Sequence, residues 1–101
     1  MDNFGPKQPA EEYYVRFDYS NILVGTAFTG EIASATAVSK NLTSGVDESD
    51  TMIGDIEVNA TSVDVEVKAG TDGVRYKITC LATTLIGEVF ELDAKLLIRE
   101  I

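Results

Sequence analysis

The clearest pattern in the chain is a strict alternation of apolar and polar residues in two runs near its C-terminal end. The runs cover residues 74–83 and 88–99, and Thr84-Leu85-Ile86-Gly87 is a short turn between them. A period of two over about ten residues is typical of half-buried antiparallel strands, because successive side chains of a strand point to opposite faces. The runs therefore predict a long hairpin, with an inward face made of Val74, Tyr76, Ile78, Cys80, Ala82, Phe90, Leu92, Ala94, Leu96 and Ile98.

Four earlier segments also have strand-like patterns. They are residues 12–19, 31–40, 51–58 and 62–68, each rich in Val, Ile, Thr, Tyr or Ala and separated by Gly, Asn, Asp and Ser. In the second segment the pattern places two sets on opposite sides, Ile32, Ser34, Thr36 and Val38 against Ala33, Ala35 and Ala37.

Residues 22–24 are a short apolar segment, and residues 26–29 lie between two glycines, so that they form either a loop or a further short strand.

About seven short strands with turns at intervals of about 8–12 residues are typical of an all-β sandwich. We therefore predict an antiparallel, immunoglobulin-like β-sandwich. Asp72 precedes Tyr76 by four residues, and two glycines supply a tight turn just before the strand that carries the tyrosine. This arrangement matches a tyrosine corner, in which the ring packs in the core and the hydroxyl bonds back to the connecting backbone. The alternative is an ordinary core tyrosine that follows a turn.

A chain of 101 residues is expected to form one domain. Residues 1–11 contain both prolines and few apolar side chains. We expect them to form a flexible N-terminal arm, which could become ordered against a neighbouring subunit. Residues 12–101 would then form the single β-sandwich domain.

Four apolar residues do not fit the inward pattern of the hairpin. Leu81 and Leu97 fall on the outward faces of the two runs, and Leu85 and Ile86 lie in the turn between them. If these side chains cluster in the folded chain, they form an apolar patch large enough for a contact surface. They are the predicted partner-contact residues.

The composition argues against several classes of function. The formal net charge is −9, which disfavours binding to nucleic acid and to anionic membranes. The chain has no histidine, so that it offers no Ser/His/Asp or Cys/His constellation, and its lone Cys80 is expected to be a small buried side chain. We expect no enzyme, no cofactor and no zinc site. No apolar run is long enough to span a membrane, and no signal peptide is visible at the start, which favours synthesis in a cytoplasm.

The loop that includes Asp47, Glu48 and Asp50 invites a calcium interpretation, because Ca²⁺ takes carboxylate oxygens. The spacing of an EF-hand is absent, and acidic loops are usually solvated. Tyr14 is the tyrosine that the pattern places clearly outward, where it could serve a sugar site.

Several stretches together resemble a known family. These are Asp18-Tyr19-Ser20-Asn21-Ile22-Leu23, Glu31-Ile32-Ala33-Ser34-Ala35, the stretch from Gly70 to Thr79, Thr83-Thr84 with Gly87, and Leu97-Ile98-Arg99-Glu100. The chain resembles, over most of residues 17–100, small proteins of tailed-phage and prophage structural gene clusters, described as fibre-tail adaptor or head–tail region proteins. The chain departs from that pattern at Ala69, where glycine is common, and at Tyr19, where tryptophan is common.

The resemblance implies a non-enzymatic structural protein that docks to other virion proteins in the tail or head–tail region. It would be made in the bacterial cytoplasm, would belong to the virion, and could form a homo-oligomeric ring. Fibronectin type III domains share the entry to the strand after residue 73. An adhesion, carbohydrate-binding or ligand-binding module is therefore the alternative.

Overall fold

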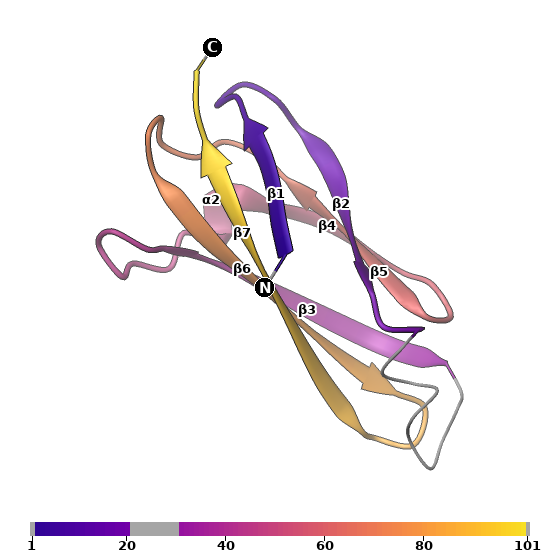
Figure 1. The fold of residues 1–101 in the computed structure, drawn as a ribbon. Coiled ribbons are helices and arrows are strands. Elements are labelled where there is room, and N and C mark those ends of the chain that lie inside the picture. Colours follow the sequence, from indigo (N-terminus) through magenta and orange to yellow (C-terminus); the bar gives the residue numbers. More distant parts are fainter. Residues whose placement is uncertain (1, 21–30, 101) are drawn as a thin grey trace.

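The computed structural model describes residues 2–20 and 31–100 of the chain. In that part of the chain there are seven strands and one short helix (Figure 1). The elements are β1 (Asp2–Lys7), β2 (Tyr13–Asp18), β3 (Ile32–Asn41), α2 (Ser49–Met52), β4 (Ile53–Val58), β5 (Ser62–Val67), β6 (Arg75–Thr84) and β7 (Val89–Ile98). The segments 22–24 and 26–29 lie outside the described residues.

The strands form two sheets that pack against each other. Sheet A has the order β1-β7-β6-β3, and sheet B has the order β2-β5-β4. Figure 1 shows the two layers and the long β6–β7 hairpin, which extends well past β1. The predicted all-β sandwich is confirmed, whereas its immunoglobulin-like character stays a prediction. The pairing is antiparallel except between β1 and β7, which are parallel.

The β6–β7 hairpin follows the sequence pattern closely. Its register runs without a break from the pair Arg75–Leu97 to the pair Thr83–Val89. The inward residues at the centre are fully or almost fully buried, among them Ile78, Cys80, Ala82, Ala94 and Leu96. This face packs against Val63, Val65 and Val67 of β5 in one apolar cluster. Burial of such side chains supplies the main driving force for folding.

Strand β3 changes its inward face at a bulge. Its register with β6 shifts between Ile32 and Ser34. An extra residue on one strand exchanges the two faces from that point on, because the side-chain period is two. Ile32 is therefore buried, but the core-facing residues after it are Ala35, Ala37 and Ser39. The prediction that Ile32 shares a face with Ser34, Thr36 and Val38 was wrong for this reason.

The N-terminal residues differ from the predicted arm. Residues Asp2–Lys7 pair in parallel with β7, and the Phe4 ring meets the Phe17 ring edge-on at a centroid distance of 5.5 Å. The expected arm 1–11 is thus part of the sandwich at least over β1. A Cβ on Gly5, which has a φ of +85°, would lie 2.9 Å from the backbone nitrogen of Lys7 and 3.1 Å from a methyl carbon of Leu96. The close approach to β7 explains a glycine in a strand.

Lys7 fastens the end of β1 to the rest of the domain. Its side chain is fully buried, and its Nζ donates hydrogen bonds to the carbonyl oxygens of Gln8 at 2.9 Å and Ala69 at 2.7 Å. Burial lowers the pKa of the Lys7 ammonium, and the nearby carboxylates of Glu11 and Glu12 oppose that effect. The ammonium therefore joins two loops that are far apart in the sequence.

We predict that Lys7→Met destabilises the domain by about 1–2 kcal/mol, because it removes the donor of two part-buried hydrogen bonds to the carbonyl oxygens of Gln8 and Ala69. Urea denaturation measures this loss, and faster amide exchange in β1 would locate it. The exposed Lys40→Met is the control and should change the stability by less than about 0.5 kcal/mol. Equal stabilities of the two variants would show that the Lys7 bonds do not hold β1 in place.

Candidate contact surfaces

The structure divides the four predicted partner-contact residues between two places. Leu81 lies opposite Glu91, whereas Leu97 lies opposite Arg75, six residues away along β6. At about 3.3 Å per residue, the two leucines are about 20 Å apart. Leu85 and Ile86 lie beyond Leu81, in the turn of the hairpin. The four residues therefore do not form one patch, because the antiparallel register carries Leu97 to the opposite end.

The hairpin tip, which we define as Leu85, Ile86 and Val89, is an exposed apolar surface. These side chains are 62%, 59% and 58% exposed. The sequence analysis included Leu85 and Ile86 but not Val89, although the outward phase of β7 could have placed it there.

Hydrogen bonds hold the turn in a defined shape. Thr84 donates its backbone N–H to the Glu88 carbonyl at 2.8 Å, and its hydroxyl accepts a bond from the Glu88 N–H at 3.1 Å. Gly87 has a φ of +91°, which favours glycine, and donates its N–H to the Thr84 carbonyl. The Leu85 N–H also bonds to the carbonyl oxygen of Glu31, just before β3. Hydrogen bonds thus hold the turn that carries Leu85 and Ile86 in one conformation.

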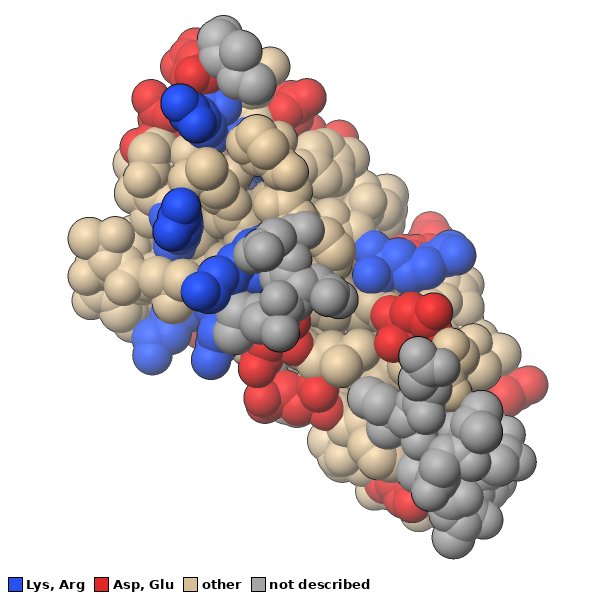
Figure 2. All heavy atoms as spheres, viewed as in Figure 1, with Lys and Arg blue, Asp and Glu red and all other residues tan. Residues whose placement is uncertain are grey.

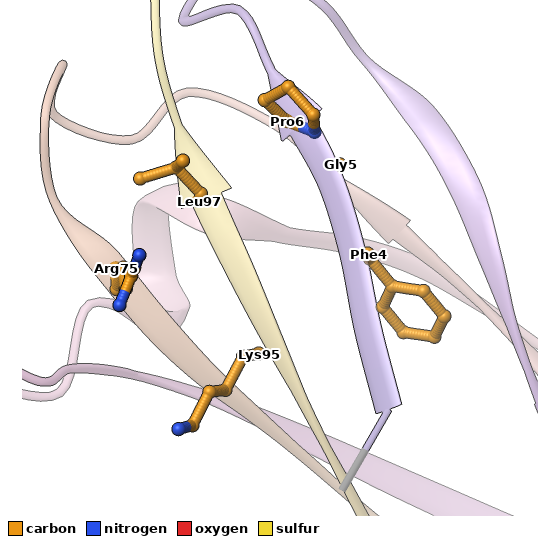
Figure 3. A pocket seen from close by; sticks show the side chains of 6 residues that line it. All are labelled: Phe4, Gly5, Pro6, Arg75, Lys95 and Leu97. Atoms are coloured by element: carbon orange, nitrogen blue, oxygen red, sulfur yellow. The ribbon is translucent and has the colours of Figure 1, made fainter.

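Leu97 lines an open groove at the other end of sheet A. The groove has a volume of about 410 Å³ and is lined by Phe4, Gly5, Pro6, Arg75, Lys95 and Leu97. Figure 3 shows the side chains of Leu97, Arg75 and Lys95 on one side of the β6–β7 pair, while the Phe4 ring points away from them. Two cations and apolar atoms of Leu97 and Pro6 therefore meet in one hollow. The β1 wall of the groove was not predicted, because residues 1–11 were expected to form an arm.

The predicted corner residues Asp72 and Tyr76 lie near one another but bond to different partners. Tyr76 is fully buried, and its hydroxyl accepts a hydrogen bond from the backbone N–H of Thr71 at 3.0 Å. It also lies 3.3 Å from Glu48 Oε1, to which it donates. The Asp72 carboxylate instead accepts a bond from the Glu100 backbone N–H at 2.9 Å. Tyr76 has the backbone bond that a tyrosine corner requires, and Asp72 holds the chain just after β7.

Asp18 and Tyr19 of the family-like motif have separate structural roles. The Asp18 carboxylate accepts a hydrogen bond from the Ser20 N–H at 2.9 Å, which lowers the pKa of Asp18. Tyr19 is fully buried, and its hydroxyl donates to the Cys80 carbonyl oxygen in β6 at 2.7 Å. Burial raises the pKa of Tyr19 far above its ordinary value of 10.0, and it raises the pKa of the Cys80 thiol above 9.0.

The side chain of Asp47 in the acidic loop is hydrogen-bonded within the loop itself. The Asp47 carboxylate accepts hydrogen bonds from the hydroxyl and the backbone N–H of Ser49, which together lower the pKa of Asp47. Within residues 2–20 and 31–100, no group of three or more His, Cys, Asp or Glu side chains is placed to hold a metal ion. In the same residues, no helix has the length and apolar character needed to cross a membrane.

The fold defines a small two-sheet β-domain with an exposed apolar turn at one end and a groove of mixed lining at the other. The chain belongs to the Gp77 family, described as podophage GP4 fiber-tail adaptor protein gp77, whose family model matches residues 7–97. The resemblance noted in the sequence is thereby confirmed, and the chain is a structural protein of a phage tail and a component of the virion. A comparison with curated proteins gave no significant match.

The raised pKa values of Tyr19 and Cys80 predict a loss of stability in alkali. Both groups keep their protons longer in the folded chain, so their stabilising effect is complete below the unfolded pKa values and is lost as pH rises above them. Between about pH 9 and 11, the free energy of unfolding should fall by up to about 1.4 kcal/mol per pH unit for each group.

Urea denaturation at several pH values measures this fall. Tyr19→Phe should reduce the slope above about pH 10. Partial burial and the nearby carboxylates of Asp55 and Glu66 also raise the pKa of Tyr14, but its side chain is 46% exposed, so Tyr14→Phe should reduce the slope less. An unchanged slope in Tyr19→Phe would contradict the assigned role of its buried hydroxyl.

Proposed function

We propose that this chain is a passive docking domain that joins a tail protein to a fibre protein through two separate surfaces. The observation that carries the proposal is the placement of the hairpin tip and the Leu97 groove at opposite ends of the β6–β7 pair. The domain is 44 Å long and only 22 and 21 Å across, so that partners at its two ends would not collide. The family description supports an adaptor between two such partners.

The hairpin tip is the stronger of the two docking candidates. Three apolar side chains, each more than half exposed, stand beside one another on a turn that hydrogen bonds brace. Large apolar side chains that gather on a surface usually mark a contact with another protein. A braced turn also loses little conformational freedom on binding, which favours affinity.

The Leu97 groove supplies the second surface. Its wall combines the aliphatic Leu97 and Pro6 with the cations Arg75 and Lys95. An apolar side chain of a partner could fill the hollow while a neighbouring carboxylate meets a cation, which is the usual mixture of a protein–protein interface.

No catalysis and no cofactor form part of this proposal, and the net charge of −9 disfavours nucleic acid as the partner. Several copies could surround the tail as a ring, in keeping with the symmetry of most assemblies. The adhesion or carbohydrate-binding alternative has less support, because the Asp47 carboxylate is already bonded to Ser49.

Incorporation into virions tests the docking role of the tip. We predict that Leu85→Ser/Ile86→Ser lowers the amount of this protein in purified particles by about tenfold, because loss of an apolar contact of about 1.4 kcal/mol changes an equilibrium by that factor. Quantitative mass spectrometry of the particles measures the amount.

The matched control is Val46→Ser, which replaces a side chain that is 55% exposed in a different loop. It should enter particles normally. All variants should keep a melting temperature close to that of the original chain, so that poor incorporation is not a folding defect. Normal incorporation of the tip variant, with fibres attached, would contradict the proposal.

A further inference from the structure

Three lysines form a continuous row across the outer face of sheet A. Lys40 of β3 lies directly opposite Lys77 of β6, which in turn lies directly opposite Lys95 of β7. Arg75 lies two residues before Lys77 and shares its face. We call Lys40, Arg75, Lys77 and Lys95 the basic face. It holds four of the eight Lys and Arg residues of a chain whose net charge is −9.

Among the described residues, Lys40 of the basic face has an acid directly opposite it, Asp47, and none of the four cations forms an ion pair. Across residues 2–20 and 31–100 the one ion pair joins Arg16 to Asp64, on the other sheet. The acids on the outer face of β7, Glu91 and Asp93, lie further toward the hairpin tip. Residues 21–30 contain no acidic side chain. Like charges directly opposite one another weaken a sheet, so this row favours an external anionic partner.

The outer face of sheet B has the opposite charge. Glu57 of β4 lies opposite Asp64, and Glu66 of β5 lies opposite Tyr14 and accepts a hydrogen bond from the backbone N–H of Asp55. Asp18 is on the same outward phase of β2. We call Asp18, Asp55, Glu57 and Glu66 the acidic face. Tyr14 lies among these acids and is 46% exposed.

The two faces are the outer surfaces of the two layers of one sandwich. They therefore point in opposite directions. Four cations on one side match four carboxylates on the other, and none of the eight takes part in an ion pair with a described residue, although Asp47 lies opposite Lys40 and Arg16 lies on the acidic side. Figure 2 shows blue Lys and Arg atoms gathered on the left of the view, beside tan side chains over the part of the molecule where β6 and β7 lie. The molecule has a pronounced charge asymmetry from one layer to the other.

We propose that the basic face of one copy of this chain docks onto the acidic face of a second copy. The contact joins two different surfaces, so it is heterologous, and repeated addition of copies closes into a ring or continues as an open stack. Leu97 on the basic side and Tyr14 on the acidic side supply apolar area to the same contact. The proposal deepens the docking function proposed above and rests on it. It assigns a second copy as the partner of the Leu97 groove, which shares Arg75 and Lys95 with the basic face, and it leaves the hairpin tip for another virion protein.

Charge complementarity favours a second copy over nucleic acid. A duplex would meet the basic face, but the remaining surface of this acidic protein repels phosphate. Repulsion between two whole copies is limited, because exposed charges further apart than about 8 Å are largely screened at physiological salt. Charges in direct contact across an interface are screened much less, and complementary faces also steer association. A contact between the basic face of one copy and the acidic face of the next would therefore explain why the domain has both faces.

Sedimentation velocity of the purified chain tests the proposal without any other virion protein. At the lower salt, about 150 mM NaCl, the sedimentation coefficient should rise as the protein concentration approaches about 1 mM, and in about 1 M NaCl it should stay that of a monomer. The basic-face variant Lys77→Gln/Lys95→Gln and the acidic-face variant Asp55→Asn/Glu57→Gln should each associate about tenfold more weakly at the lower salt.

A mixture of the two variants gives the sharpest outcome. Each variant keeps one intact face, so the two should form a one-to-one dimer that cannot grow further. The control Glu31→Gln/Glu100→Gln removes two exposed acids that lie outside the strands of both faces and should associate like the original chain. Relief of the repulsion between lysines should also raise the melting temperature of the basic-face variant by about 1–3 °C.

A chain that stays monomeric at about 1 mM in about 150 mM NaCl would overturn the proposal, as would association that neither variant weakens. Binding of a short DNA duplex to the basic face at concentrations where copies do not associate would also overturn it in favour of nucleic acid. Each of these results would leave docking to tail and fibre proteins intact, because virion incorporation of the tip variant tests that function separately.

Discussion

The pairing of β6 with β7 is the interaction on which the rest of the structure depends. Nine residue pairs in unbroken register hold the two strands together, and β1 and β3 join the sheet on either side of them. The inner face of the pair carries Tyr76, Ile78 and Leu96 into the core. Its outer face and its turn carry both proposed contact surfaces. The register also fixes the distance between the hairpin tip and the Leu97 groove. The pairing of β6 with β7 therefore determines both the stability of the domain and the placement of its proposed contact surfaces.

Much of the fold could be predicted from the sequence because the alternation of apolar and polar residues marks a half-buried strand whichever strand it pairs with. The period of two placed Ile78, Cys80 and Ala94 inward, and their near-zero exposure confirms it. The strand β1 could not be found in this way. Its partner β7 lies at the other end of the chain, and Gly5 and Pro6 suggest a loop. The bulge at the start of β3 could not be predicted either, because the alternation of apolar and polar residues does not show where a strand contains an extra residue.

The contact surfaces could be predicted only in part. Alternation identified Leu97 as an outward residue, and the turn identified Leu85 and Ile86, but whether they meet depends on the strand register. The lysine row needed the same information: Lys40, Lys77 and Lys95 are widely separated in the chain and become neighbours only across three strands. An overall charge of −9 conceals such a row, because composition does not record on which face each charge lies.

A cryo-electron microscopy reconstruction of the assembled tail would test the central claim most directly. That claim is that the outer face and the turn of the β6–β7 pair are the surfaces through which this domain is held in the virion. The account predicts that the hairpin tip and the side chains of Lys77, Lys95 and Leu97 are buried against neighbouring proteins. The account would be contradicted by a reconstruction in which these residues face solvent and the domain is held by the edges of its sheets.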